Sequence, residues 1–308
     1  MIPPVNFRLT CVLAVWALLQ VHSASADPGH LTPAAVGYIE QLAGNLEDFS
    51  IERRGSAVPL ALLLPLHVGD RLIVRGAGSM ALLQCGNRSL RVTERDSPFV
   101  VPPVTAPPNF LTRLGSLLME VGSRLTTQQA KTVTKVSTSS RGEEIPLAIP
   151  LLHDRMNQIP RNGAALYLGW TGGVPPYDLL LLPQVAGSVE FVHLKGLEEP
   201  RVAVPLASAL SPGFFRVEVT DNDGTIVRGT FEVVETMPSL SVAGDVGLQD
   251  NDLPVPLHAV MTADVWAQRN PAQWSLHAYQ TVAPFGDSFE PARLLRDCLE
   301  ESETCHRR

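Results

Sequence analysis

Turn-forming residues divide the stretch between residues 145 and 235 into short apolar segments, and this pattern limits the possible folds more than any other. A glycine pair, a proline pair and an Asp-Asn-Asp-Gly run are among the residues that stand between the segments, and such residues favour tight connections between β-strands. Seven strands of this kind predict a β-sandwich. The expected strands cover residues 145–153, 164–170, 177–182, 189–194, 201–205, 214–220 and 226–234.

The predicted sandwich resembles immunoglobulin-like and fibronectin-like modules. The segment 210–217, which leads into the sixth expected strand, is similar to the entry to the penultimate strand in those modules, and Trp170 takes the place of a core tryptophan. The region has no cysteine for a disulfide between the two sheets, as in bacterial versions of the fold. We therefore expect an Ig-like β-sandwich over residues 145–236.

The turn from Asp221 to Gly224 has a second interpretation, because two carboxylates placed two positions apart can share a calcium ion. An EF-hand loop would require Asp at position 219 and Glu at position 230, where this chain has Val219 and Thr230. We therefore predict a hairpin turn and no metal site.

Composition supports a chain that is mainly β. The 26 prolines and 23 glycines fit many short strands and turns, while 45% hydrophobic and only 18% charged residues indicate an ordered chain. The formal charge of −7 is not interrupted by any block rich in lysine and arginine. We therefore expect neither nucleic acid nor an anionic membrane surface as a partner.

The first 26 residues have the three parts of a secretory signal peptide. Arg8 precedes an apolar run over residues 9–21, and Ala24-Ser25-Ala26 supplies the small residues of a cleavage site. A retained signal anchor is the alternative, but the run of 13 residues is shorter than the roughly 20 that span a bilayer. A lipoprotein signal would use Cys11, although Arg8 and Thr10 fit it poorly. We expect cleavage after about Ala26, a periplasmic location, and no membrane-integral segment in the mature chain.

Residues 36–104 resemble the periplasmic domain of the FecR family. The similarity lies in a Val-Gly-x-Ile start, a strand followed by an Arg-Gly turn, an apolar residue before Gly-Asp-x-Leu, and a strand pair around a glycine turn. The matching residues are Val36, Gly37, Ile39, Arg54, Gly55, Val68, Gly69, Asp70, Leu72 and Gly86.

The FecR resemblance implies a small β-domain that works in the periplasm by contacts rather than by catalysis. The founding type relays an outer-membrane transport signal to a sigma factor through a retained membrane helix and a cytoplasmic segment. This sequence shows neither feature, so the resemblance implies the β-module without the sigma-regulating role. The Gly69-Asp70 pair itself predicts a tight turn.

A helical pattern follows the proline-rich segment 102–108. Apolar residues recur every three or four positions over four turns, which predicts an amphipathic helix. This stripe packs on a neighbouring β-domain or docks a partner, and the sequence leaves both alternatives open. The segment 126–144, rich in Thr, Ser and Lys, is predicted to be an exposed linker. The residues of the possible docking stripe are Leu111, Leu114, Leu118, Val121 and Leu125.

The C-terminal segment is predicted to be helical, with helices over residues 256–268, 272–283 and 289–301. Cys298 and Cys305 are the expected disulfide pair in an oxidising compartment. On one continuous helix their spacing would correspond to about 10 Å of rise, too far for a disulfide, so the helix must end between them. Cys85 follows an apolar run and is expected to be a buried, unreactive thiol.

No catalytic signature is present in the sequence. We find no HExxH, GxSxG or SxxK motif, no glycine-rich phosphate loop and no Cys/His zinc spacing. We therefore predict no catalytic residues, no cofactor and no metal, and a protein that is not an enzyme. The expected function is that of an exported bacterial envelope protein that acts through protein contacts, as a sensor or scaffold accessory, with a periplasmic or membrane protein as partner.

Two other functions stay open. A module that binds glycan or cell-wall polymer would need exposed aromatic residues, and a hydrolase with an unrecognised site would need convergent polar side chains in a deep pocket. Finding the five candidate aromatic residues buried would remove the first. These residues are Trp170, Tyr177, Trp266, Trp274 and Tyr279.

The predicted organisation is mainly β, with one helical linker and one helical segment. A signal peptide (1–26) precedes a FecR-like β-domain (27–105), an amphipathic helix with a Thr/Ser-rich linker (106–144), an Ig-like β-sandwich (145–236) and a helical C-terminal segment (237–308). The oligomeric state is left open.

Overall fold

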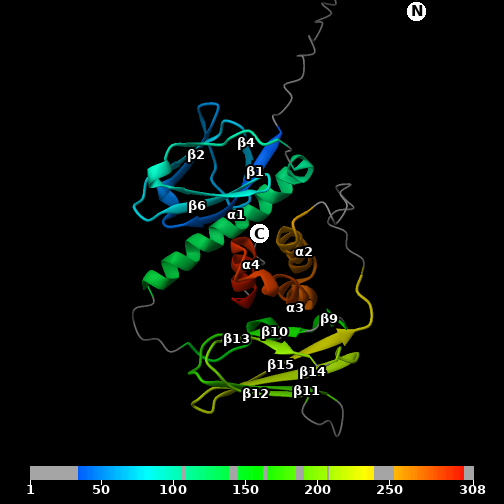
Figure 1. Cartoon of the computed structure of the whole chain (residues 1–308). Coiled ribbons are helices and arrows are strands. Elements are labelled where there is room, and N and C mark those ends of the chain that lie inside the picture. The colour runs from blue at the N-terminus through cyan, green and yellow to red at the C-terminus, as the bar shows by residue number, and fades with distance from the viewer. Residues whose placement is uncertain are drawn as a thin grey trace, which may run out of the picture. The chain divides into compact units, whose positions relative to one another are not determined.

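Strands dominate the architecture, as expected. The computed structural model describes residues 34–105, 108–138, 145–153, 155–161, 165–184, 191–206, 208–238 and 253–301 (Figure 1). In these residues fifteen strands form four sheets, and four α-helices accompany them. The predicted signal peptide lies outside the described residues. No helix in the described ranges is long and apolar enough to cross a membrane.

The N-terminal β-domain contains two four-stranded sheets, with the strand orders β4-β1-β6-β7 and β3-β2-β5-β8. Alternating apolar residues explain the strands: β6, for example, buries Ala81, Leu83 and Cys85 on one face. The predicted turn after β2 is present, with Arg54 and Gly55 both at positive φ. The strands are β1 (Ala35–Ala43), β2 (Phe49–Arg53), β3 (Ser56–Val58), β4 (Pro65–His67), β5 (Arg71–Val74), β6 (Met80–Cys85), β7 (Arg88–Thr93) and β8 (Phe99–Val100).

Asp70, which the sequence predicted as a turn residue, is buried and joins three segments of this domain. Its carboxylate accepts hydrogen bonds from the Arg53 guanidinium at 2.9 and 2.8 Å and from the backbone N–H of His67 at 2.8 Å. The same guanidinium donates to the carbonyl of Pro65 at 2.7 Å. The Gly-Asp turn therefore links β2, β4 and β5.

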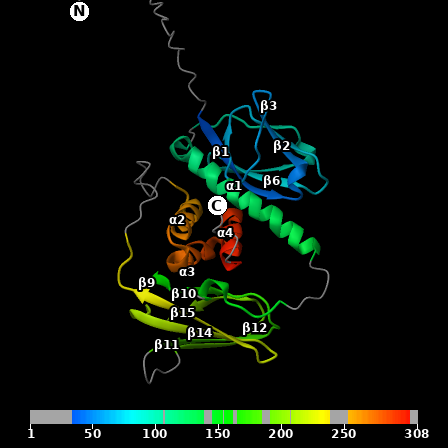
Figure 2. The same ribbon diagram turned by 180° about the vertical axis from the view of Figure 1, so that it is seen from behind.

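Helix α1 (Asn109–Thr138) lies against β1 and β4 of this domain and against α4 (Figures 1 and 2). It passes very close to the loop before β4: a Cβ added to Gly122 would lie 1.7 Å from the carbonyl oxygen of Leu62. Thr126 Oγ1 accepts a hydrogen bond from the Leu62 N–H at 2.8 Å. A glycine in this helix thus permits backbone-to-backbone contact.

The predicted exposed linker over residues 126–144 is wrong for residues 126–138, because α1 continues to Thr138. Gln128 and Gln129 are buried, and Gln129 Nε2 donates to the carbonyl of Leu42 at 2.6 Å. Polar side chains at the start of the segment, such as Thr126 and Gln129, make tertiary contacts, so low apolar content did not indicate a loop there. Residues 139–144 lie outside the described residues.

The second β-region contains a five-stranded sheet, ordered β12-β11-β14-β15-β9, and a two-stranded sheet of β10 and β13. All pairings are antiparallel except that of β15 with β9. Trp170, at the end of β10, is buried beside Tyr177, with ring centroids 5.3 Å apart. The strands are β9 (Asn157–Pro160), β10 (Ala165–Gly169), β11 (Tyr177–Pro183), β12 (Val192–Leu197), β13 (Arg201–Pro205), β14 (Gly213–Thr220) and β15 (Ile226–Val234).

Six of the seven strands expected in this region are present, and one is not. Residues 145–153 form a single β-bridge, Ala148 to Thr171, followed by a 3₁₀ turn over Pro150–Leu152. Proline at 146 and at 150 withholds two backbone donors, which prevents a regular ladder. The short strand β9, which the sequence did not predict, takes the edge position beside β15.

The turn after β14 is the predicted hairpin turn. Asp221 is buried, and its carboxylate accepts hydrogen bonds from the backbone N–H groups of Asp223 at 3.1 Å and Thr225 at 2.8 Å. Gly224 has φ +81°. The side chain of Asp221 therefore organises the turn.

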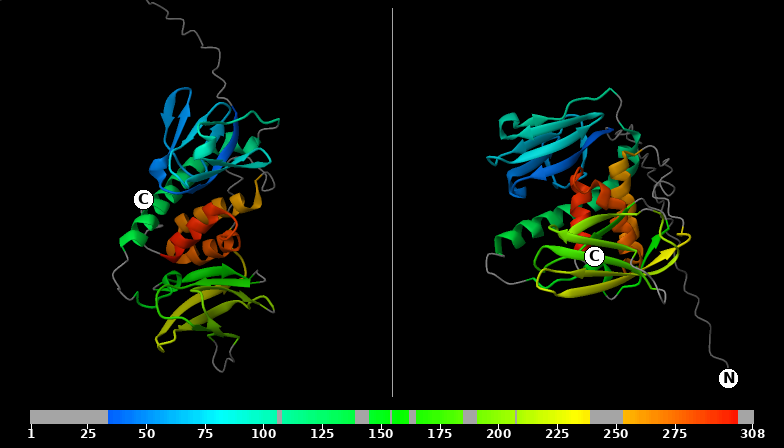
Figure 3. Two further views of the ribbon diagram at one scale, coloured as in Figure 1. Left: turned by 60° about the vertical axis from the view of Figure 1, so that its left-hand side comes forward. Right: turned by 60° about the horizontal axis from the view of Figure 1, so that its bottom comes forward.

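The C-terminal helices match their predicted positions to within one or two residues. They are α2 (Val255–Arg269), α3 (Pro271–Val282) and α4 (Glu290–Glu300), and they pack on one another and on β9 and β10 (Figure 3). Pro256, Pro271 and Pro291 stand in the first turn of the three helices, where a missing N–H costs nothing. Buried apolar residues form one continuous core through both β-regions and the helices, within a single compact unit, Pro33–Arg308.

Candidate functional site

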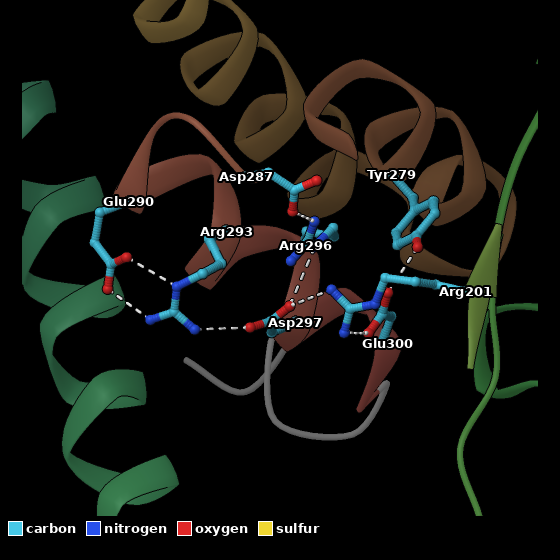
Figure 4. A network of polar contacts seen from close by, with 8 residues as sticks. All are labelled: Arg201, Tyr279, Asp287, Glu290, Arg293, Arg296, Asp297 and Glu300. Carbon is cyan, nitrogen blue, oxygen red and sulfur yellow. Dashed lines mark hydrogen bonds and ion pairs between the residues drawn. The ribbon is translucent and has the colours of Figure 1, made fainter. Parts of the chain in front are cut away.

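Helix α4 carries a group of ion pairs and hydrogen bonds that links it to β13 and α3 (Figure 4). We call this group the α4 network. It contains four carboxylates, three guanidinium groups and one phenol. Its members are Arg201, Tyr279, Asp287, Glu290, Arg293, Arg296, Asp297 and Glu300.

Glu300 lies at the buried end of the α4 network. Its carboxylate accepts a hydrogen bond from the Tyr279 hydroxyl at 2.6 Å and pairs with Arg201 at 3.2 Å. A Cβ added to Gly169, at the end of β10, would lie 2.7 Å from Glu300 Oε1 and 2.8 Å from the Tyr279 hydroxyl. Glycine at this position therefore lets the sandwich approach α3 and α4 closely.

Asp297 connects three arginines. Its carboxylate lies 3.4 Å from Arg201, 3.1 Å from Arg293 and 3.2 Å from Arg296. Arg201 thus bridges Asp297 and Glu300, which lie three positions apart on α4. This bridge joins a strand of the sandwich to the last helix.

The remaining members of the network extend it toward solvent. Arg293 makes a two-pronged contact with Glu290 at 2.8 and 2.6 Å, which raises the pKa of its guanidinium. Arg296, only 7% exposed, pairs with Asp287 at 3.0 Å, and Asp287 is almost fully exposed. The network therefore runs from solvent at Asp287 to the interior at Glu300.

Burial sets the electrostatics at the inner end. It raises the pKa of Glu300, and the hydrogen bond from Tyr279 and the charge of Arg201 oppose this only in part. The pKa of Tyr279 is raised well above its ordinary value, first by burial and then by the negative charge of Glu300. A phenol that resists ionisation and acts as a donor holds this carboxylate in place. The α4 network therefore links α4 to α3 and to β13 and stabilises their packing.

A second polar contact joins α1 to α2. Arg124 pairs with Asp264 at 2.6 Å and with Glu120 at 2.9 Å, and Gln268 donates to Asp264 at 2.6 Å. Burial raises the pKa of Asp264, and the charge of Arg124 opposes that rise. This contact links the C-terminal helices to α1, and the α4 network links them to the sandwich.

The predicted docking stripe faces the interior. All five side chains are at most 5% exposed and belong to the continuous core. Of the two alternatives that the sequence left open, packing within the chain describes the structure, and the stripe is not accessible to a partner in this conformation. The residues concerned are Leu111, Leu114, Leu118, Val121 and Leu125.

Cys85 and Cys298 lie within the described residues. Cys85 is free and buried, and burial raises the pKa of its thiol. Cys298 is buried and disulfide-bonded. Helix α4 ends at Glu300, between Cys298 and Cys305, which is the condition that the predicted bridge requires. Cys305 lies outside the described residues, so the pairing stays a prediction.

The aromatic residues proposed for glycan binding are all buried. Each is at most 5% exposed, and Trp266 and Trp274 pack against each other with ring centroids 5.1 Å apart. The observation that favoured a glycan-binding surface is therefore removed. The five residues are Trp170, Tyr177, Trp266, Trp274 and Tyr279.

The α4 network differs from a metal site in its composition, because its carboxylates are paired with guanidinium groups. Within the described ranges, no three His, Cys, Asp or Glu side chains come together as metal ligands would. The sequence did not single out the α4 network, because Arg201 and Tyr279 are far from α4 along the chain. Its one local signal is the spacing of Glu290, Arg293 and Asp297, which permits contacts along a helix at intervals of three and four residues.

Comparisons with known proteins place the chain in no family. No family model and no curated protein matches it. Among solved structures, CopC from Methylosinus trichosporium OB3b is a match that aligns at 19% identity over 32% of this chain and 97% of the CopC chain, with a TM-score of 0.21. A similarity at this TM-score supports no conclusion about fold or function. The FecR-like and Ig-like resemblances therefore stay predictions.

Proposed function

We propose that this protein is an exported, non-enzymatic bacterial envelope protein that acts through protein contacts, as a sensor or scaffold accessory. The proposal rests on the predicted signal peptide and on one structural observation, the solvent-facing side of the five-stranded sheet. We call this side the outer sheet face. It comprises Leu180, Leu182, Phe214, Arg216, Glu218, Ile226 and Arg228.

The outer sheet face departs from the usual alternation of apolar and polar residues. Leu179 and Leu181 of β11 point into the core, and Leu180 and Leu182, which alternate with them, point outward, so that β11 is apolar on both sides. On β14 and β15, Phe214 is 45% exposed and Ile226 is 49% exposed. Exposed apolar groups on one sheet face are typical of surfaces that contact other proteins.

Charged residues stand among these apolar groups. Glu218 on β14 pairs with Arg216 at 2.9 Å and with Arg228 at 3.2 Å, and register places Glu218 between Leu180 and Arg228. Aromatic residues and arginine are enriched in protein interfaces, where salt bridges at the rim give specificity. The composition of the face thus favours a protein partner.

The glycan-binding alternative loses its support because its five aromatic residues are buried. No specific observation supports the hydrolase alternative. The charged side chains of the α4 network pair with one another and link structural elements. We therefore propose the protein-contact function alone.

Lysine cross-linking in the intact envelope tests the proposal. The sequence has three lysines, at 131, 135 and 195, and Lys195 is exposed on β12, at the edge of the five-stranded sheet. We expect the chain in the periplasmic fraction and cross-links from Lys195 to another envelope protein, identified by mass spectrometry. The matched control is Lys195→Arg, which keeps the charge and should abolish these cross-links. A cytoplasmic location, or cross-links within the chain alone, would contradict the proposal.

A further inference from the structure

A cavity of about 430 Å³ lies where α3 meets the sandwich. Its walls come from β9 and the residue after it, from β10, from the segment that follows β13, and from α3 and the turn after it. Sites for small molecules usually have about 300–1,000 Å³. The cavity is therefore large enough for a small ligand and is separate from the outer sheet face.

Most of the cavity wall is apolar. Ile159, Leu166 and Leu210 are buried residues that line it, and Leu206 and Pro284 complete the apolar part. Apolar walls around an open volume favour a ligand with an apolar body, because its transfer from water removes apolar surface on both sides.

Two polar side chains of the wall are already engaged. The Gln280 amide bonds the backbone of Tyr167 in both directions: its Oε1 accepts from the N–H at 2.8 Å and its Nε2 donates to the carbonyl at 2.7 Å. Thr281 Oγ1 donates to the carbonyl of His277 at 2.9 Å. The Gln280 amide thus attaches α3 to β10, whereas the Thr281 hydroxyl bonds within α3, and both groups are already engaged.

His277 contributes a neutral group to the wall. Burial lowers the pKa of its imidazole to about 4, so the ring carries no charge near neutral pH. Within the described part of the chain, its buried Nδ1 has no hydrogen-bond partner. The ring packs edge-on against Trp266, with centroids 5.2 Å apart. A tryptophan thus lies directly behind one wall of the cavity.

Arg161 supplies the positive charge at this cavity. It follows β9 and lines the cavity, and its side chain is 51% exposed. It pairs with Glu235 at 3.6 Å, and Glu235 is 64% exposed. Exposed pairs of this length contribute little, about 0–1 kcal/mol, so a carboxylate of a ligand competes readily for this guanidinium.

We propose that the cavity binds small amphipathic carboxylic acids, with the apolar body between α3 and β10 and the carboxylate at Arg161. The apolar walls select the body, and the guanidinium at the edge of the apolar part selects the anionic end. This inference is independent of the proposed protein-contact function, since it uses a different surface of the molecule.

Calorimetric titration of the purified full chain with decanoate, below its micellar concentration, tests the inference. We expect saturable binding with one site per chain and a change in tryptophan fluorescence, because Trp266 lies behind His277. The neutral isostere 1-decanol should bind at least about tenfold more weakly, because it makes no charge-assisted bond to Arg161. Absence of saturable decanoate binding, or equal affinity for decanol, would overturn the proposal.

Three variants locate the site. Thr281→Phe fills the cavity from α3 and should weaken decanoate binding at least about tenfold, equivalent to about 1.4 kcal/mol. The matched control Ala272→Phe adds the same ring volume at an exposed position of the same helix and should bind like the wild type. Arg161→Met removes the charge at similar length and should weaken decanoate about tenfold while leaving decanol unchanged.

Circular dichroism checks the fold of each variant, and Thr281→Leu replaces Thr281→Phe if the larger side chain prevents folding. Unchanged decanoate affinity in the filled variant, or equal loss in Ala272→Phe, would place binding elsewhere and overturn the proposal.

Discussion

Single buried carboxylates organise separate parts of this protein. Asp70 joins β2, β4 and β5 through Arg53 and the His67 N–H, and Asp221 closes the turn between β14 and β15. Glu300 holds Tyr279 and Arg201 together. The sequence located the first two as turn residues, since Gly-Asp and Asp-x-x-Gly patterns are local. It did not reveal their buried partners, which depend on tertiary contacts.

Asp70→Asn should destabilise the protein strongly. The substitution keeps the size of the side chain but removes the charge that pairs with Arg53, and the Asp70 side chain is only 2% exposed. Arg53 is partly exposed and keeps some hydration, so loss of these charge-assisted hydrogen bonds should cost about 1.5–3 kcal/mol. Urea denaturation measures the change.

The control for Asp70→Asn is Glu52→Gln in the neighbouring pair with Arg71. Both side chains of that pair are substantially exposed, so the loss should be about 0–1 kcal/mol. Equal losses in the two variants would contradict the role assigned to Asp70.

Glu300 should make stability depend on pH in a specific direction. Burial raises its folded pKa above the unfolded value of about 4.3, so the native state binds this proton more tightly. The resulting contribution to stability is full below the unfolded pKa and is lost as the pH rises through the folded pKa. We expect the unfolding free energy of the wild type, relative to Glu300→Gln, to fall over that range. Urea denaturation of both proteins at a series of pH values measures it, and a difference that grows with pH would contradict the account.

At the scale of elements, α1 shows both the strength and the limit of sequence patterns. Its first half was predicted because apolar residues repeat at helical spacing. Its continuation beyond Leu125 was missed because the tertiary contacts there include polar ones, such as Gln129 with the Leu42 carbonyl and Thr126 with the Leu62 N–H. The α4 network was missed for the same reason, because it also consists of polar contacts between distant parts of the chain. In contrast, six strands of the second β-region followed from local alternation and turns alone.

Gly122→Ala should disrupt the contact between α1 and the loop before β4. The new Cβ would lie 1.7 Å from the Leu62 carbonyl oxygen, so helix and loop must separate. Overpacking of this kind costs about 1–3 kcal/mol. Thermal unfolding measures the loss.

The matched control is Gly115→Ala on the same helix, where the new Cβ would meet Pro65 at an ordinary 3.7 Å. There the better helix propensity of alanine should stabilise the protein by up to about 1 kcal/mol. Effects of the same sign in the two variants would show that close approach does not decide the outcome.

At the scale of the whole molecule, the described regions share one core and one compact unit. Helix α1 contacts β1 and β4 of the N-terminal β-domain and α4, while the α4 network attaches the sandwich to the C-terminal helices. The regions that the sequence pattern suggested as separate domains therefore make extensive contacts with one another.

This integration predicts cooperative unfolding. Tryptophan fluorescence reports on the sandwich and the C-terminal helices, through Trp170, Trp266 and Trp274, whereas far-ultraviolet circular dichroism reports on all regions. The two transitions in urea should coincide. A separate dichroism transition without a fluorescence change would show that the N-terminal β-domain unfolds alone.

Photo-cross-linking from the outer sheet face in living cells tests whether this face contacts another envelope protein. A photoreactive phenylalanine analogue replaces Phe214, and in a control replaces Val68, which is 48% exposed on the N-terminal β-domain. We predict a covalent adduct with another envelope protein from position 214 alone, and its loss when Ile226→Glu places a charge on the same face. No adduct, adducts only between copies of this chain, or equal adducts from both positions would contradict the proposal that this face makes the functional contact.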